Sequence, residues 1–280
     1  MHKPDFLIIG AAKSATTWLQ QSLQANPGIF MPDPELHFFS RHYDDGIDSY
    51  WRQFDAAGER MVGEKSNTYL SEPAAAARIA RHLPDVSLIA QLRDPVARAY
   101  SDYCMLFRRG EVGADIDAHL DPRRAAEGRF LSHGLYSRQI DRFLDLFPPE
   151  RLLVLFYEDI KADPRNSLDR LARHVGCPEA LARPVSERVK DARRPVVPPR
   201  LRKILTPLRP VLDPVRHLAP MRMIRAGVAR ELAYPPLSPD LSARMADFFA
   251  EDIARLERLT GRDLSIWPSR GRTRQDAAHV

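Results

Sequence analysis

Near the N-terminus the chain reads Phe6-Leu7-Ile8-Ile9-Gly10-Ala11-Ala12-Lys13-Ser14-Ala15-Thr16-Thr17-Trp18. The apolar run at residues 6–9 predicts a buried parallel strand, residues 10–14 a turn, and residues 15–24 a helix. Such a turn presents free backbone N–H groups at the positive end of a helix dipole, which suits a phosphate. Lys13 adds a positive charge, and three hydroxyl donors follow at Ser14, Thr16 and Thr17. The segment therefore predicts an α/β fold with an anion site after its first strand.

The rest of the chain alternates short apolar runs with helix-length patterns, which is typical of α/β architecture. Further strands are expected at residues 61–64, 86–92 and 152–156, and helices at residues 73–83, 95–107, 135–147, 164–175 and 238–259. Residues 188–230 carry twelve Lys and Arg against two Asp, and residues 195–239 hold ten prolines, so short helical pieces and loops are expected there. We expect one domain over residues 1–280: a core at about 4–177, the basic proline-rich segment at about 188–237, and a C-terminal helix at about 238–260.

Composition sets broad limits on the class of protein. Hydrophobic residues make up 44% and charged residues 28% of the 280 residues, which excludes a disordered or fibrous chain. The net charge of +5 permits an anionic partner without requiring one. The two cysteines, Cys104 and Cys177, exclude a disulfide framework and a four-cysteine zinc site. The first apolar stretch is too short for a transmembrane segment and lacks the features of a signal peptide, so a cytoplasmic enzyme or binding protein is expected.

The turn after the first strand differs from a Walker A loop. That motif requires G-x-x-x-x-G-K-[ST], whereas here Ala12 precedes Lys13 and Gly10 lies only three positions upstream of the lysine. The missing second glycine disfavours a GTPase or an ATPase. The structural alternative is a tight strand-to-helix turn with a capping serine.

A second candidate motif follows the strongest predicted strand and reads Gln91-Leu92-Arg93-Asp94-Pro95, with Ser101-Asp102-Tyr103 further on. Arg93 stands at the carboxyl end of a strand, the edge where open α/β sheets bind ligands. A guanidinium offers a planar fork for a phosphate, and Ser101 a neutral donor. The structural alternative pairs Arg93 with a carboxylate, Asp94 or Asp102. Asp94 and Pro95 also predict an N-cap and a first-turn proline for the next helix.

Together the two segments resemble the sulfotransferase family that uses 3′-phosphoadenylyl sulfate (PAPS). Residues 13–17 match its 5′-phosphosulfate loop, and residues 92–95 with 101–103 match its 3′-phosphate motif. Two segments are also similar to heparan sulfate sulfotransferases: residues 34–39 (Pro34-Glu35-Leu36-His37-Phe38-Phe39) and residues 63–70 (Gly63-Glu64-Lys65-Ser66-Asn67-Thr68-Tyr69-Leu70). Pro34 stands where those enzymes have lysine, and Asn67 where they have proline. The resemblance covers about residues 4–177.

The resemblance implies a single α/β domain related to P-loop nucleotide kinases, with a central parallel sheet flanked by helices. It implies PAPS as the donor and adenosine 3′,5′-bisphosphate as the product. A sulfuryl group carries less charge than a γ-phosphoryl group, so the chemistry runs without bound Mg²⁺ and no metal site is expected. The acceptor would be a carbohydrate, a glycolipid or a small natural product. No nucleic-acid partner and no transmembrane segment are expected.

The same resemblance assigns roles to individual residues. The 5′ end of the donor would be held, largely through backbone N–H groups, by Ser14, Ala15, Thr16, Thr17 and Trp18. Arg93 and Ser101 would bind the 3′-phosphate. Lys13 would stabilise charge on the bridging oxygen, and Lys65 would lie beside the acceptor and the sulfuryl group.

Glu35 aligns with the catalytic glutamate of the heparan sulfate enzymes and is the candidate base. On an extended segment His37 would point the same way, so that it could orient Glu35 or replace it as the base. The alternatives are a surface glutamate and a structural histidine.

A basic loop late in the chain, with Lys190, Arg193 and Arg194, occupies about the place of another nucleotide-binding loop, although the family's Lys-Gly-Arg pattern is absent. A solvated basic loop is the alternative there. Two other functional classes stay open: a P-loop kinase or NTPase with a degenerate loop, and a non-enzymatic protein that binds polyanions or membranes through residues 188–230.

Overall fold

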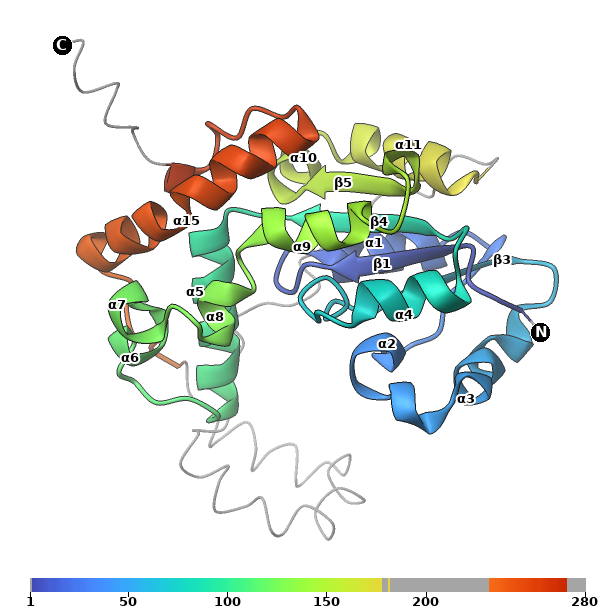
Figure 1. Ribbon diagram of the computed structural model, residues 1–280, viewed down its shortest axis with the longest axis horizontal. Coiled ribbons are helices and arrows are strands. Elements are labelled where there is room, and N and C mark those ends of the chain that lie inside the picture. Colours follow the sequence, from blue (N-terminus) through green and yellow to red (C-terminus); the bar gives the residue numbers. More distant parts are fainter. Residues whose placement is uncertain (1, 178–180, 182–231, 271–280) are drawn as a thin grey trace, which may run out of the picture.

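Five strands form a parallel sheet in the computed structural model, which describes residues 2–177, 181 and 232–270 (Figure 1). The strands lie in the spatial order β2-β3-β1-β4-β5. Their bounds are β1 (Phe6–Gly10), β2 (Ile29–Phe30), β3 (Met61–Lys65), β4 (Ser87–Leu92) and β5 (Leu152–Phe156). All four pairings are parallel, and Leu7 of the central strand lies opposite Glu64 on one side and Leu88 on the other. The expected α/β class with a central parallel sheet is confirmed.

Alternate residues of the strands enter two separate hydrophobic cores, as the two-residue period of a strand requires. Leu7 and Ile9 of β1 pack in one core, while Phe6 and Ile8 pack in the other. Both faces of the sheet are therefore covered, which explains why β1 reads as a continuous apolar run.

The longer helices that pack in the first core are α4 (Ala75–His82), α5 (Pro95–Arg109), α9 (Tyr136–Leu144) and α15 (Pro239–Thr260). The second core is closed by α1 (Thr16–Gln24) and α11 (Pro164–Val175). Figure 1 shows α1 behind the strands and α4 in front of them. The amphipathic helix α15 brings Leu241, Met245, Phe249, Ile253 and Leu256 into the first core, so residues near the C-terminus complete its packing.

The direction of the strand connections reverses between β1 and β4. From β1 the chain crosses through α1 to the far edge strand β2, whereas β4 is followed in the sheet by β5 on the opposite side. Connections that leave two neighbouring strands in opposite directions open a space beyond their carboxyl ends, where α/β proteins bind ligands. Here the neighbours are β1 and β4, which precede the two candidate phosphate motifs.

The remaining elements are short. Between β2 and β3 lie α2 (Phe38–Arg41), η1 (Tyr43–Asp45), α3 (Ile47–Trp51) and η2 (Arg52–Ala57). After α5 follow α6 (Asp117–Leu120), α7 (Pro122–Ala125), α8 (Arg129–Ser132) and, before β5, η3 (Pro149–Arg151). The helix α10 (Tyr157–Ala162) follows β5, and η5 (Pro268–Arg270) follows α15. None of the helices in the described ranges has the length and apolar character that a membrane span requires.

Most predicted elements are present within one to three residues of their predicted ends. Asp94 caps α5 as expected, because its side chain accepts a hydrogen bond of 2.8 Å from the backbone N–H of Ala97. The sequence pattern did not predict the two-residue strand β2 or the short helices α2, α3, α6, α7, α8 and α10, all too short for a periodic signal. Most of the proline-rich segment, and with it Lys190, Arg193 and Arg194, lies outside the described residues. That the whole chain forms one domain stays a prediction.

Candidate active site

The turn after β1 lies close to the segment that follows β3. A Cβ on Gly10 would lie 2.8 Å from the Cβ of Leu70, so a larger residue would push the loop away from the segment after β3. Lys13 and Ala15 adopt left-handed backbone conformations, with φ of 71° and 64°. Alternation of left-handed and right-handed residues turns successive N–H groups toward a common point, the geometry of an anion-binding nest.

Strand β4 holds this loop from the neighbouring position in the sheet. The N–H of Ala11 donates to the carbonyl of Gln91 over 2.8 Å, and the side-chain amide of Gln91 donates to the carbonyl of Ser14. Gln91 is fully buried, and no role was predicted for it from the sequence. The available signal was a polar residue within the apolar run of residues 86–92.

Arg93 lies beside the same loop. One guanidinium nitrogen donates to the carbonyl of Lys13 over 3.3 Å, and the guanidinium stacks on the ring of Tyr157 at 4.8 Å. Within the described ranges Arg93 forms no ion pair with a carboxylate. Asp102 instead contacts two other arginines, at 3.7 Å from Arg98 and 3.1 Å from Arg129. The structural alternative for Arg93 therefore fails for both acids considered, and its cationic group faces the phosphate loop.

Lys65, at the end of β3, connects the loop to the candidate base. Its ammonium nitrogen lies 2.8 Å from Oε1 of Glu35 and 3.3 Å from the hydroxyl oxygen of Thr17. Only 2% of the Lys65 side chain is exposed, against 18% for Glu35. The buried ammonium is thus shared between the phosphate loop and a carboxylate that solvent still reaches.

Glu35 is held on both carboxylate oxygens. Beside the Lys65 contact, it accepts hydrogen bonds from Asn67, at 3.0 Å from the backbone N–H and 3.1 Å from the side-chain amide. Burial raises the pKa of Glu35, but the charge and hydrogen bond of Lys65 and the Asn67 N–H outweigh it, so the pKa falls below its ordinary value. Glu35 is therefore ionised at neutral pH.

His37 lies next to Glu35, although not for the expected reason. Its Nε2 atom is 3.7 Å from Oε2 of Glu35, and its Nδ1 atom is 2.9 Å from the hydroxyl of Thr68. The expectation of an extended segment is wrong at this residue, because His37 has a left-handed φ of 53° and occupies the N-cap position of α2. Burial lowers the pKa of His37, Glu35 opposes that shift, and the nearby cations Arg41 and Lys65 add to it. The imidazole is neutral at physiological pH.

The buried carboxylate of Glu64 is connected to His37 through Ser66. Glu64 accepts hydrogen bonds from the hydroxyl of Ser66 and, over 3.2 Å, from Tyr50. The Ser66 hydroxyl in turn accepts from the backbone N–H of His37 over 2.7 Å. Burial raises the pKa of Glu64 to about 7, although hydrogen bonds from Ser66, Tyr69 and Tyr50 oppose the shift. Glu64 belongs to the segment at residues 63–70, but no role was predicted for it from the sequence.

The other predicted residues lie around the loop. Ser14 and Thr16 are buried, and Trp18 packs against the core on the α1 side of the sheet. Ser101 is partly exposed on α5. The structure thus brings together Glu35, His37, Lys65 and Thr17 by direct contact, and Lys13 with Arg93. Among the described residues no group of three or more His, Cys, Asp or Glu side chains is arranged to hold a metal ion. The roles of all these residues stay predictions.

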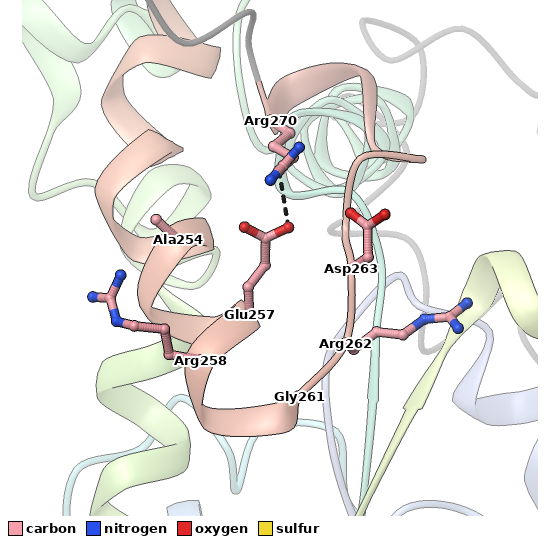
Figure 2. A pocket seen from close by; sticks show the side chains of 7 residues that line it. All are labelled: Ala254, Glu257, Arg258, Gly261, Arg262, Asp263 and Arg270. Atoms are coloured by element: carbon pink, nitrogen blue, oxygen red, sulfur yellow. Dashed lines mark ion pairs between the residues drawn. The ribbon is translucent and has the colours of Figure 1, made fainter. Parts of the chain in front are cut away.

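A hollow at the C-terminal end of α15 is a separate feature (Figure 2). Its lining residues are Ala254, Glu257, Arg258, Gly261, Arg262, Asp263 and Arg270. None of them belongs to the two phosphate motifs or to the Glu35 cluster. The Nε atom of Arg270 lies 2.8 Å from Oε1 of Glu257, so part of its charge is neutralised within the hollow itself.

Comparison with known proteins decides the family. The family model described as "Sulfotransferase domain" matches residues 3–194, more than half of the chain. The chain belongs to the sulfotransferase family. The expected family is therefore confirmed, and both phosphate motifs and the Glu35 cluster lie inside the matched residues.

Two human relatives illustrate the similarity of this sulfotransferase to proteins of known function. Bifunctional heparan sulfate N-deacetylase/N-sulfotransferase 3 is 32% identical over 193 residues, covering 62% of this chain and 22% of that protein. Heparan sulfate glucosamine 3-O-sulfotransferase 3B1 is 30% identical over 182 residues, covering 62% of this chain and 46% of that protein. The chain thus spans less than half the length of these relatives.

A solved structure agrees over nearly the whole chain. The crystal structure of a sulfotransferase from Alicyclobacillus acidocaldarius superposes with a TM-score of 0.67 at 28% identity. The match covers 95% of this chain and 99% of that one. The expected sulfotransferase fold is confirmed.

Proposed function

We propose that this sulfotransferase transfers a sulfuryl group from PAPS to a hydroxyl group of a carbohydrate acceptor. Glycolipids and small natural products are the other acceptor classes. An amine is the second type of acceptor group. The observation that carries the proposal is the position of Lys65, between Glu35 at 2.8 Å and Thr17 of the phosphate loop at 3.3 Å. That position puts a cation between a proton acceptor and the place where a donor's phosphosulfate would lie. The two heparan sulfate relatives support a carbohydrate acceptor.

The residues present fit the donor nucleotide. The left-handed conformations at Lys13 and Ala15 are those of an anion-binding nest, which would suit a 5′-phosphosulfate. Arg93 contacts that loop and has no carboxylate partner among the described residues, so its charge is available for a 3′-phosphate, with Ser101 as a neutral donor. When bound, PAPS supplies an activated sulfuryl group on a phosphate leaving group.

Glu35 would act as the base. Its lowered pKa keeps it ionised at neutral pH, and 18% of its side chain remains exposed, so that an acceptor hydroxyl can reach it. Removing the hydroxyl proton as the new bond forms typically contributes about 10²–10⁴-fold to a rate. Lys13 and Lys65 would stabilise the negative charge that develops on the leaving oxygen.

His37 supports Glu35 in this arrangement. A neutral imidazole at 3.7 Å from Oε2 can orient the carboxylate, or accept the proton itself, because its lowered pKa leaves it unprotonated. The contact between Nδ1 and Thr68 fixes the ring. We assign the base role to Glu35 because it contacts Lys65 directly, and Lys65 in turn contacts Thr17.

Binding of the product nucleotide tests the donor. We expect adenosine 3′,5′-bisphosphate to bind in the presence of EDTA, because the nucleotide contacts derive from protein N–H groups and cations. Titration calorimetry in EDTA measures this directly. If that nucleotide fails to bind and Mg·ATP binds well, a degenerate P-loop kinase replaces the proposal.

Transfer of label tests the acceptor. Isotopically labelled PAPS is incubated with panels of sugar, glycolipid and phenolic acceptors, and labelled products are identified. We expect transfer to a sugar hydroxyl. Binding of sulfated polysaccharide that collapses with added salt, without any transfer, would instead indicate the polyanion-binding class.

A further inference from the structure

The segment that follows α15 returns to the carboxyl edge of the sheet. We name residues 261–270 the C-terminal hook. It begins at Gly261, whose φ of 62° ends the helix and reverses the chain, and it finishes in η5. The hook lies outside residues 3–194, the part of the chain that the family model matches. Figure 2 shows the hook running back beside α15, with Arg270 pointing to Glu257.

Glu257 of α15 contacts the hook at two positions. Its Oε1 atom accepts a hydrogen bond of 2.8 Å from the backbone N–H of Leu264. The same atom lies 2.8 Å from Nε of Arg270 (Figure 2). Leu264 is 1% exposed and packs in the first core. A single carboxylate thus holds the hook against the helix from the solvent side, while Leu264 anchors it from inside.

The hook contributes one buried aromatic ring, Trp267, which packs near Tyr136. Trp267 is 1% exposed, and its ring centroid lies 6.2 Å from that of Tyr136 and 5.9 Å from that of Phe156. Tyr136 donates its hydroxyl hydrogen to the backbone carbonyl of Arg93 over 2.9 Å. Burial raises the pKa of Tyr136, which keeps the phenol protonated and able to donate. Trp267 therefore packs against Tyr136, and Tyr136 holds the backbone carbonyl of Arg93.

The hook also contacts Asp94, the residue that follows Arg93, directly. The backbone N–H of Ser269 donates to Oδ2 of Asp94 over 3.0 Å, while Oδ1 of Asp94 accepts from Ala97. Ser269 and Asp94 are both buried. The Asp94 carboxylate is thus shared between the first turn of α5 and the hook.

We propose that the C-terminal hook is a positioning element for the 3′-phosphate of the donor nucleotide, and that Trp267 is its principal positioning residue. The proposal rests on the proposed function, because it assumes that Arg93 binds that phosphate. A guanidinium on a long flexible side chain binds well only when its backbone directs it, because charge-assisted hydrogen bonds depend on distance and angle. The hook fixes the Arg93 carbonyl through Tyr136 and the Asp94 carboxylate through Ser269.

Two nucleotides separate this role from a general effect on stability. Adenosine 3′,5′-bisphosphate carries the 3′-phosphate, and adenosine 5′-monophosphate lacks it. We expect Trp267→Leu to weaken binding of the bisphosphate by about tenfold, while binding of the monophosphate changes by less than about twofold. Phe54→Leu, at another fully buried aromatic in the same core, is the matched control and should leave the ratio of the two affinities unchanged.

A double-mutant cycle tests whether the hook acts through Arg93. In an Arg93→Ala background, Trp267→Leu should no longer change the affinity for the bisphosphate. If Trp267→Leu does not fold, Glu257→Ala releases the hook from its solvent side and should lower the same ratio, whereas Glu251→Ala on the exposed face of α15 should not.

Three outcomes overturn the proposal. The hook has no positioning role if Trp267→Leu and Glu257→Ala keep the wild-type ratio of affinities, or if the loss persists undiminished without the Arg93 side chain. If the wild-type protein binds both nucleotides equally and Arg93→Ala changes neither affinity, the assignment of Arg93 fails, and the proposed function fails with it.

Discussion

The ammonium nitrogen of Lys65 lies 2.8 Å from Oε1 of Glu35, with the lysine almost fully buried and the glutamate partly exposed. A buried ammonium needs a counter-charge, because an isolated charge is costly to remove from water. The same contact lowers the pKa of Glu35, so one interaction stabilises the buried lysine and keeps the candidate base ionised. The strength of Glu35 as a base is therefore limited by the lysine that places it.

Glu35→Gln tests the base. The amide keeps the shape of the side chain and an acceptor for Lys65 but cannot take a proton at neutral pH. We expect kcat to fall by about 10²–10⁴-fold while the affinity for donor nucleotide stays near normal. Steady-state kinetics with labelled PAPS and calorimetry on the same samples measure both quantities.

His37→Ala and the double variant complete this test. If Glu35 and His37 act as a pair, the double variant should lose less activity than the two single losses combined. A glutamine variant with most of its kcat would remove Glu35 from the mechanism. If His37→Ala then abolishes turnover, the histidine is the base.

Arg93→Ala tests the 3′-phosphate assignment. Loss of one charge-assisted contact is worth about 1.5–3 kcal/mol, or roughly ten- to a hundredfold in affinity for adenosine 3′,5′-bisphosphate. Thermal unfolding should change little, since the described residues provide no carboxylate partner for Arg93. Arg109→Ala, at an exposed arginine near the end of α5, is the control. Unchanged nucleotide affinity in a folded Arg93→Ala variant would make this arginine structural.

Asn67→Ala tests how the carboxylate of Glu35 is tuned. The variant loses the 3.1 Å hydrogen bond from the side-chain amide and keeps the backbone N–H. Because a donor to the ionised form lowers the pKa of an acid, its removal should raise the pKa of Glu35. If activity needs ionised Glu35, kcat should fall on acidification at a higher pH in the variant than in the wild type, by up to about one pH unit. If the fall of kcat at low pH occurs at the same pH in both proteins, a group other than Glu35 causes it.

Glu64→Gln tests the buried carboxylate. Since the pKa of Glu64 rises from 4.5 to about 7 on folding, the unfolded chain releases the proton at lower pH than the folded protein. The folded state therefore loses stability as the pH rises from 4.5 to 7, by at most about 3 kcal/mol. The amide does not titrate. The free energy of unfolding of the variant should therefore rise relative to that of the wild type as the pH increases from 4.5 to 7. Denaturant unfolding at several pH values measures the difference.

An exposed carboxylate provides the control for that measurement. Glu59→Gln, at an exposed position before β3, is the control variant for the same series of unfolding measurements. A constant difference between Glu64→Gln and the wild type from pH 4.5 to 7 would show that Glu64 does not change its pKa on folding.

Local sequence determined the elements and the order of the motifs. Apolar runs of strand length, the Asp94-Pro95 cap and the small residues after Ile9 act over a few neighbouring positions, so they can be interpreted without knowledge of the rest of the chain. The carboxyl ends of parallel strands meet at one edge of the sheet, and for this reason the phosphate loop and Arg93 could be expected to lie together.

The tertiary structure alone decided how the site is assembled. Lys65 reaches both Glu35 and Thr17 because β3 lies beside β1, and Asn67 fills its role because the chain after β3 folds over the carboxylate. The turn at His37 departs from the extended geometry that spacing predicted, because its backbone N–H is held by Ser66. The contact of Ser269 with Asp94 joins residues 175 positions apart. Such contacts depend on the packing of the whole sheet and its helices, which no local pattern encodes.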